Sequence, residues 1–280
     1  MGYSKPGTQP SKKKPFNKKK PVNKKWRLSK PWTIALVVVI ALLAIVASLC
    51  GYSYYQSTST ASAAAESQKK MLSKAPFTEV AQSLDDSIKY QYGNSNTGIP
   101  GANQLKEYQQ LTTPMTGWGY AAAPKQDGLP EPITALPIYE GASDQTLAWG
   151  FGTIEPGYKM GKHNNLLAIH NFADGVTYGS PLQDIDVSKS PKFYQTDGRK
   201  IYEYQLTKYD NEVQATSKEY TDAVAQTVND TVTLVTCYLP GYIYTPDHNR
   251  RVVVTGERVK TMEFARASSD IQQLFPMFVK

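Results

Sequence analysis

The longest apolar stretch of the chain lies near its N-terminus. From Trp32 to Cys50 the sequence runs through nineteen residues without a charged side chain. At a rise of about 1.5 Å per residue, a helix of that length crosses a hydrocarbon core of about 30 Å. Aromatic residues at both ends, among them Trp26 and Tyr52, suit the two membrane interfaces. The pattern predicts one transmembrane helix over residues 31–52.

The stretch after this span is polar. Residues 53–100 are rich in Ser, Thr, Ala and Lys, and within them residues 63–74 have the composition of a helix. We interpret 53–100 as an extracellular stalk. Residues 101–280 are numerous enough for one domain with its own core. Because the stalk is expected to contribute no strand, a chain cut near residue 100 should stay soluble, folded and active.

The pattern in residues 101–280 favours strands. Short runs rich in Val, Thr and Tyr alternate with turns rich in Gly and Pro, and helical periodicity is scarce after residue 125. The runs with strand character are residues 133–139, 165–170, 200–208, 231–237 and 251–259. Short helices are expected only at residues 144–150 and 217–226. The pattern therefore indicates a single mainly β domain, a barrel or sandwich carrying one or two short helices.

Charge is concentrated at the N-terminus. Residues 1–30 contain ten lysines, one arginine and no acidic residue, whereas the whole chain has 31 basic and 24 acidic residues. The segment is predicted to be a disordered tail. A nucleic-acid-binding tail is the alternative, but the membrane span beside it favours the positive-inside rule. The N-terminus is therefore expected in the cytoplasm and the C-terminal domain outside, with no nucleic-acid partner.

Two other interpretations of the apolar stretch are weaker. Ala61-Ser62-Ala63 resembles a signal-peptidase site, but the basic segment is long, the apolar run exceeds about 15 residues, and the site lies far beyond its end. Cys50 suggests a lipoprotein, but Leu49 before it is large where such sites need a small residue. We therefore assign no chemistry to Cys50.

Cys237 is the remaining cysteine of the chain. It ends the run Thr233-Leu234-Val235-Thr236-Cys237, at the junction of a predicted strand with a loop. With Cys50 in the membrane, the extracellular domain cannot form an internal disulfide, and a lone thiol there is a candidate reactive group. The strand alone is equally compatible with a small buried apolar residue.

A histidine and an arginine occupy comparable positions. His170 directly follows the apolar run of residues 166–169, which repeats the arrangement at Cys237. Arg250 and Arg251 open the apolar run of residues 252–255, where a guanidinium can hold a carbonyl oxygen as it becomes negative. A solvated basic pair is the alternative.

The other two histidines have different surroundings. His163 lies in a predicted turn and His248 in a loop. A zinc site built from the histidines and Cys237 is the rival interpretation, but the spacings match no common zinc pattern. We therefore expect neither a metal nor a cofactor.

Together these elements resemble the sortases, the membrane-anchored cysteine transpeptidases of Gram-positive bacteria, across roughly residues 130–260. Residues 233–237 fit the TLxTC motif of that family, residues 167–170 its histidine strand end, and residues 251–256 its arginine strand. The residues before the histidine are similar to the pattern of class A sortases: Ile138-Tyr139-Glu140-Gly141, Leu147, Gly150, Gly152-Thr153 and Met160-Gly161. The order His, Cys, Arg separates the chain from NlpC/P60-like hydrolases, where the cysteine comes first. Asn171 departs from the pattern, because many class A members have a second histidine there.

The resemblance implies an eight-stranded sortase-type β-barrel and a cell-wall-anchoring transpeptidase in the plasma membrane. Cys237 would attack an LPxTG-like sorting signal of an exported protein and form a thioester, which an amine of a peptidoglycan precursor would resolve. His170 would act as general acid and base, and Arg251 would stabilise the oxyanion. The family also implies that only a minority of the enzyme holds a thiolate–imidazolium pair.

The predicted substrate groove surrounds the end of the strand at Cys237. Thr236 is expected to shape the oxyanion hole, and Ala168, Tyr242 and Ile243 to contact the peptide, with the loops 238–250 and 209–230 on either side. Two alternatives remain open: a tethered β-domain that binds a wall polymer or protein partner without chemistry, and an extracellular cysteine hydrolase.

Overall fold

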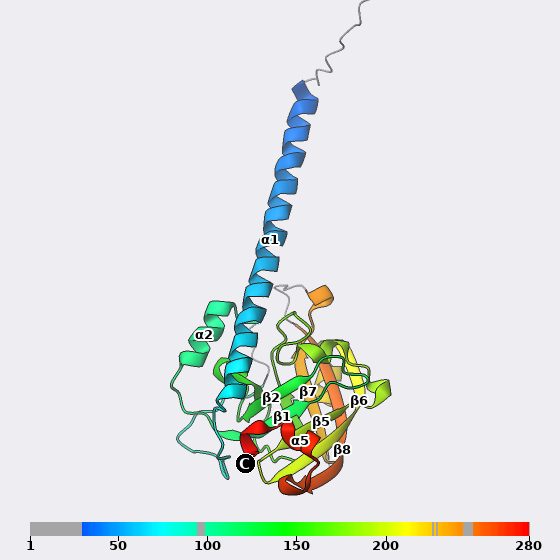
Figure 1. The fold of residues 1–280 in the computed structure, drawn as a ribbon. Coiled ribbons are helices and arrows are strands. Elements are labelled where there is room, and N and C mark those ends of the chain that lie inside the picture. The colour runs from blue at the N-terminus through cyan, green and yellow to red at the C-terminus, as the bar shows by residue number, and fades with distance from the viewer. Residues whose placement is uncertain (1–29, 94–98, 226, 228, 243–248, 280) are drawn as a thin grey trace, which may run out of the picture. The chain divides into compact units, whose positions relative to one another are not determined.

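The computed structural model describes residues 30–93, 99–225, 227, 229–242 and 249–279 (Figure 1). The chain divides into two units, Met1–Ala47 and Ser48–Lys280. Residues 1–29 of the predicted tail lie outside the described part, as do Ile243 and His248.

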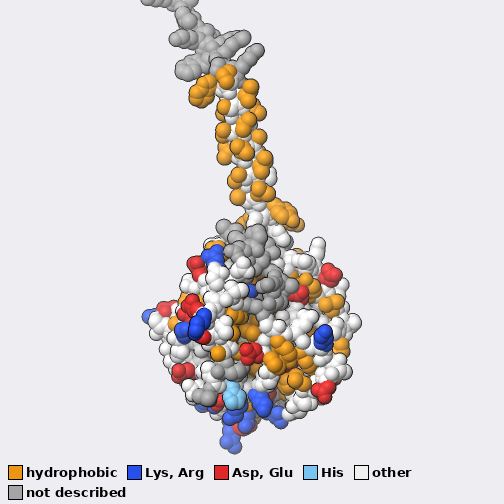
Figure 2. Space-filling view, turned by 180° about the vertical axis from the view of Figure 1, so that it is seen from behind, with side chains coloured by type: hydrophobic (Ala, Val, Ile, Leu, Met, Phe, Trp, Pro, Cys, Tyr) orange, Lys and Arg blue, Asp and Glu red, His pale blue; other side chains and the backbone are white. Residues whose placement is uncertain are grey.

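One long helix, α1, runs over Lys30–Ser73. Within the first unit its apolar side chains are exposed, for example Trp32 at 68% and Leu43 at 63%. The face seen in Figure 2 shows hydrophobic side chains along this part of the helix. A helix that is apolar all round is unstable in water and suits the interior of a membrane. In the part of the chain that the structure describes, α1 is the one helix long and apolar enough to span a membrane.

The second unit contains an eight-stranded closed barrel, which confirms the predicted fold class. Its strands are β1 (Gly117–Ala123), β2 (Ile133–Tyr139), β3 (Phe151–Thr153), β4 (Asn164–Ala168), β5 (Lys192–Thr196), β6 (Lys200–Gln214), β7 (Thr231–Cys237) and β8 (Arg250–Glu263). Around the barrel they follow the order β1-β2-β3-β4-β7-β8-β6-β5. The pairs β2 with β3 and β4 with β7 are parallel, and the others are antiparallel.

Short helices connect and flank the strands. They are α2 (Ala102–Gln110), α3 (Asp144–Trp149), α4 (Lys218–Ala223) and α5 (Ser269–Gln273). Single 3₁₀ turns are η1 (Ser180–Asp184), η2 (Val187–Lys189), η3 (Pro240–Tyr242), η4 (Phe264–Arg266) and η5 (Pro276–Phe278). Ser143 and Ser217 cap α3 and α4, because each side chain accepts a hydrogen bond from a backbone N–H of the first turn.

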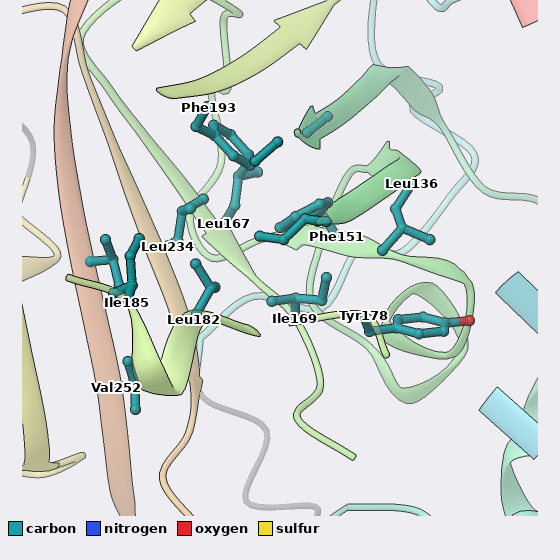
Figure 3. Packing of buried hydrophobic residues seen from close by; sticks show 14 of the residues in the cluster. Leu136, Phe151, Leu167, Ile169, Tyr178, Leu182, Ile185, Phe193, Leu234 and Val252 are labelled. Atoms are coloured by element: carbon teal, nitrogen blue, oxygen red, sulfur yellow. The ribbon is translucent and has the colours of Figure 1, made fainter. Parts of the chain in front are cut away.

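The barrel core is formed by alternate residues of its strands. Leu167, Leu234 and Val252 point into one cluster with Phe151 and Phe193 (Figure 3). Side chains alternate between the two faces of a strand, so their immediate neighbours along the chain face outward. The outward positions of β4, β7 and β8 are therefore available to build a site on the barrel surface.

Part of the predicted stalk packs on the barrel. Ala64, Met71 and Ile99 belong to the core cluster and are at most 3% exposed. The side chain of Gln68 donates to the hydroxyl of Thr134 and accepts a hydrogen bond of 3.0 Å from the backbone N–H of Tyr178. The position of the domain boundary stays a prediction, but α1 residues from 48 onward contribute to the packing of the second unit.

Candidate active site

Sheet pairing brings the ends of three strands together. β7 and β8 are antiparallel with Cys237 directly opposite Arg251. β4 runs parallel to β7 with Ala168 opposite Val235, and the backbone N–H of Ile169 extends this pairing with a 3.0 Å bond to Val235 O. His170 is the next residue along the chain, so its position is fixed by the strand that carries the cysteine.

Alternation places the two paired side chains on the same outer face. Directly opposite residues of an antiparallel pair have Cβ atoms about 4.5–5.5 Å apart. Leu234 and Val252 point into the core. Cys237 lies three positions after Leu234 and Arg251 one position before Val252, so both side chains point to the outer face. His170, Cys237 and Arg251 line one small cavity of about 30 Å³. The three residues that the sequence singled out are thus brought together.

His170 is almost completely buried, with 5% of its surface exposed. Its Nε2 atom has no hydrogen-bond partner among the described residues, and its ring packs on Phe172 at 5.5 Å between centroids. Burial lowers the pKa of His170 to about 4, against a smaller opposing effect of the Asp144 carboxylate. The imidazole is therefore neutral at pH 7 and Nε2 can accept a proton.

Burial also raises the pKa of the Cys237 thiol, and the positive charge of Arg251 opposes the rise. A raised thiol pKa beside a lowered imidazole pKa favours the neutral pair over the ion pair at pH 7. The resting site thus holds a thiol and a neutral imidazole.

The two neighbouring arginines have different surroundings. Arg251 is 4% exposed, and its Nη1 donates a 3.1 Å hydrogen bond to the carbonyl of Arg250. Arg250 forms a 2.9 Å ion pair with Glu212 and lies over the ring of Tyr238, 5.3 Å from its centroid. Only Arg251 lines the cavity. Its buried guanidinium beside the thiol is the positive charge that a developing oxyanion requires.

Two buried amides link the loops on either side of the site. Asn171 Nδ2 donates to the carbonyl oxygen of Cys237 at 3.0 Å and to Gln183 Oε1 at 2.9 Å. Gln183 Oε1 also accepts from the N–H of Leu239, and its Nε2 donates to the Leu239 carbonyl, both at 2.8 Å. Asn171 and Gln183 therefore hold the chain directly after Cys237 against the chain directly after His170.

The four residues predicted to line the substrate groove lie in different surroundings or outside the described residues. Ala168 is partly exposed and packs on the outer face of the sheet, two residues before His170. Thr236 is 2% exposed and donates its hydroxyl to Ile169 O at 2.8 Å, so it ties β7 to β4. The backbone of Tyr242 lies in η3, whereas Ile243 is outside the described residues. Their roles in binding stay predictions.

Several residues of the site were not expected from the sequence. Gly93, Ala142 and Leu147 line the cavity with the three predicted residues. Gly93 belongs to the predicted stalk, and its N–H donates a 2.8 Å bond to Ile154 O. The resemblance marked Leu147 only as part of the class A pattern, and no motif marks Gly93 or Ala142, because they reach the site through the packing of distant segments. The exposed His163 does not line this cavity.

Comparison with known proteins is consistent with this geometry. Residues 129–259 match a family model described as the sortase domain. A sortase A of Streptococcus agalactiae serotype III is 30% identical over 153 residues, which cover 52% of this chain and 57% of the relative. A sortase A of Listeria monocytogenes serovar 1/2a is 28% identical over 131 residues, 47% of this chain and 54% of the relative. The chain thus spans little more than half the length of these curated relatives.

Two solved sortases resemble this chain over part of its length. A structure of Listeria monocytogenes sortase A has a TM-score of 0.46 and 26% identity, covering 56% of this chain and 96% of that one. A structure of sortase C-3 from Streptococcus pneumoniae has a TM-score of 0.45 and 17% identity, covering 82% of this chain and 96% of that one.

Proposed function

Because this chain belongs to the sortase family, we propose that it is a cysteine transpeptidase that anchors exported proteins to the cell wall. Its substrate in this proposal is an LPxTG-like C-terminal sorting signal, and its acceptor is an amine of a peptidoglycan precursor. The observation that carries the proposal is the cavity shared by Cys237, His170 and Arg251 on the outer face of the barrel.

The first half-reaction forms the acyl-enzyme. The Sγ atom of Cys237 attacks the carbonyl carbon of the Thr in the sorting signal, and the thiol proton passes to the unpartnered Nε2 of His170. Arg251, with a backbone N–H, stabilises the oxyanion of the tetrahedral intermediate. His170 then gives the proton to the leaving amine, the C–N bond breaks, and a thioester remains on Cys237.

The second half-reaction reverses these roles. An amine of the peptidoglycan precursor attacks the thioester carbonyl while His170 takes its proton, and the thiol of Cys237 leaves with that proton. Because both groups rest in their neutral forms, the enzyme begins and ends each cycle without a buried charge pair. The reactive thiolate–imidazolium pair is then a minor species that forms only as the substrate is attacked.

The N-terminal part of the chain supplies location in this proposal. The apolar part of α1 crosses the plasma membrane once, since it is exposed, uncharged and long enough. The excess of Lys and Arg in residues 1–30 supports a cytoplasmic N-terminus and an extracellular barrel. This topology brings the catalytic domain to the surface where exported proteins and wall precursors meet.

Product analysis with the full-length chain in detergent micelles tests the proposal. An LPxTG peptide is incubated with the protein, with and without a panel of amines, and products are identified by mass spectrometry. We expect cleavage after Thr and a new peptide–amine bond, both lost in Cys237→Ala. Cleavage that always gives the free acid, whatever amine is added, identifies a hydrolase instead. No cleavage and no labelling of Cys237 by an electrophilic peptide analogue identify a binding domain.

A further inference from the structure

Tyr220 is a buried aromatic residue that the reaction described above does not use. It lies on α4, in the connection between β6 and β7, and α4 packs on β6 and β8. Its ring belongs to a cluster on the outer face of the barrel together with Val235 and Val253, with Ala168 at the edge. Tyr220 is 6% exposed.

The neighbours of this ring are related to the catalytic residues by simple alternation. Val235 lies two positions before Cys237, and Val253 two positions after Arg251, so each pair shares one face of its strand. Tyr220 therefore covers the outer face that leads directly to the thiol and the guanidinium. Two residues of an extended strand span about 7 Å, so the Tyr220 ring over Val235 lies about that far along β7 from Cys237. A bound peptide in an extended conformation covers the same distance with about two residues.

The hydroxyl of Tyr220 has no hydrogen-bond partner among the described residues. Three other buried tyrosines have one: Tyr120 donates to Phe77 O at 2.6 Å, Tyr178 to Ala148 O at 2.9 Å and Tyr204 to Asn165 Oδ1 at 3.0 Å. Because buried polar groups are nearly always paired, an unpaired one beside a reactive thiol indicates a missing partner.

The protonation state of Tyr220 makes it a donor. Burial raises its pKa, while the charge of Arg251 lowers it and that of a Cys237 thiolate raises it further. The phenol thus stays protonated at neutral pH, within electrostatic reach of both catalytic groups. An uncharged acceptor suits a buried phenolic O–H, and each residue of a peptide passing Tyr220 would supply one in its backbone carbonyl.

We propose that Tyr220 is a substrate-positioning residue whose hydroxyl donates a hydrogen bond to a backbone carbonyl of the bound peptide, within about two residues of the scissile bond. This inference rests on the proposed function, because it needs a peptide extending from Cys237 over the outer face of β4 and β7. Backbone recognition fixes the register of the peptide without selecting its side chains. The hydroxyl thus contributes to the placement of the Thr carbonyl at the thiol.

Tyr220→Phe removes the hydroxyl and keeps the ring. In the full-length protein we expect kcat/KM for acylation by an LPxTG peptide to fall about three- to tenfold, the effect of one neutral hydrogen bond. The rate of alkylation of Cys237 by iodoacetamide should change less than about twofold, since that reagent does not use the peptide groove. The melting temperature should stay constant or rise, because an unpaired buried hydroxyl is lost.

Tyr120→Phe is the matched control. Its hydroxyl pairs with a backbone carbonyl away from the cavity, so its loss should lower the melting temperature and leave kcat/KM unchanged. A structural role of Tyr220 would give the pattern of this control.

A set of peptides with one backbone ester each locates the contact. An ester carbonyl is a weaker acceptor than an amide, so one ester near the scissile bond should slow wild type but add little to the Tyr220→Phe defect. If Tyr220→Phe equals an active wild type with every peptide, the inference is overturned and the proposed function stands. If wild type forms no acyl-enzyme with any LPxTG peptide, the proposed function fails and the inference falls with it.

Discussion

Replacement of Arg250 and Arg251, one at a time, is the sharpest mutational test of the site. The two residues are adjacent on β8 and therefore point to opposite faces. Arg251 is 4% exposed and lies opposite Cys237. The side chain of Arg250 is 27% exposed and is paired with Glu212. The same substitution thus removes a buried charge at the thiol in one case and a surface ion pair in the other.

The expected effects differ in size and in kind. Loss of one oxyanion donor lowers kcat by about 10²–10³, or about 3–4 kcal/mol of transition-state stabilisation. Loss of Arg250 removes a surface ion pair worth about 0.2–1 kcal/mol and a cation–π contact with Tyr238 worth about 0.5–1 kcal/mol. Both contributions of Arg250 act on stability. The two alanine variants should therefore differ by at least about tenfold in turnover.

Single-turnover acylation, followed by rapid quenching and mass spectrometry, gives the rate for each variant, and circular dichroism shows whether it is folded. Arg251→Lys is the matched control for charge, and we expect it to be slow because an ammonium cannot reproduce the planar two-pronged contact. Equal acylation rates for Arg250→Ala and Arg251→Ala, or a larger defect in Arg250→Ala, would refute the assignment of Arg251 even if Cys237 and His170 proved essential.

Three further predictions follow from burial and hydrogen bonding. The pKa of His170 is about 4 in the folded protein and about 6.5 in the unfolded chain, so the unfolded state binds more protons between these values. As the pH falls from 6.5 to 4, wild type should therefore lose about 3 kcal/mol of unfolding free energy relative to His170→Gln. Urea unfolding measures this difference, and equal pH profiles of the two proteins would contradict it. Asn171→Ala and Asn171→Asp both lose the donor to Cys237 O and should unfold about 1–3 kcal/mol more easily; a fully stable Asp variant contradicts the bond. A fragment of residues 101–280 lacks the buried side chains of Met71 and Ile99, so its unfolding free energy should be about 3–6 kcal/mol lower than that of a fragment of residues 53–280. Equal melting temperatures of the two fragments would contradict this and show that the stalk does not stabilise the barrel.

The sequence predicted the elements that carry the chemistry well. The strand over residues 231–237 has the bounds of β7, because five of its seven residues are Thr or Val, which have high β-propensity, and every position except Cys237 is buried. β1 was missed since its sequence GWGYAAA is dominated by Gly and Ala, and β3 since it has three residues. Such strands form because the barrel closes around them, which no local pattern records.

The parts of the site that escaped prediction depend on long-range contacts. Gln183 meets Leu239 across 56 residues and Asn171 meets Cys237 across 66, and each residue alone resembles an ordinary polar loop position. The stalk was interpreted as a spacer because Ala, Ser and Thr form no apolar stripe, yet Ala64 is fully buried. Small residues let a helix approach a barrel closely, and their burial becomes visible only in three dimensions.

The most direct measurement is the intact mass of the full-length protein after brief incubation with an LPxTG peptide. We expect a covalent adduct with the mass of the peptide up to and including Thr, released by hydroxylamine and mapped by proteolysis to the segment containing Cys237. The adduct should be absent in Cys237→Ala and slow to form in His170→Gln. A wild-type protein that processes the peptide without any adduct, or an adduct that maps to another residue, would contradict the assignment of Cys237 as the nucleophile.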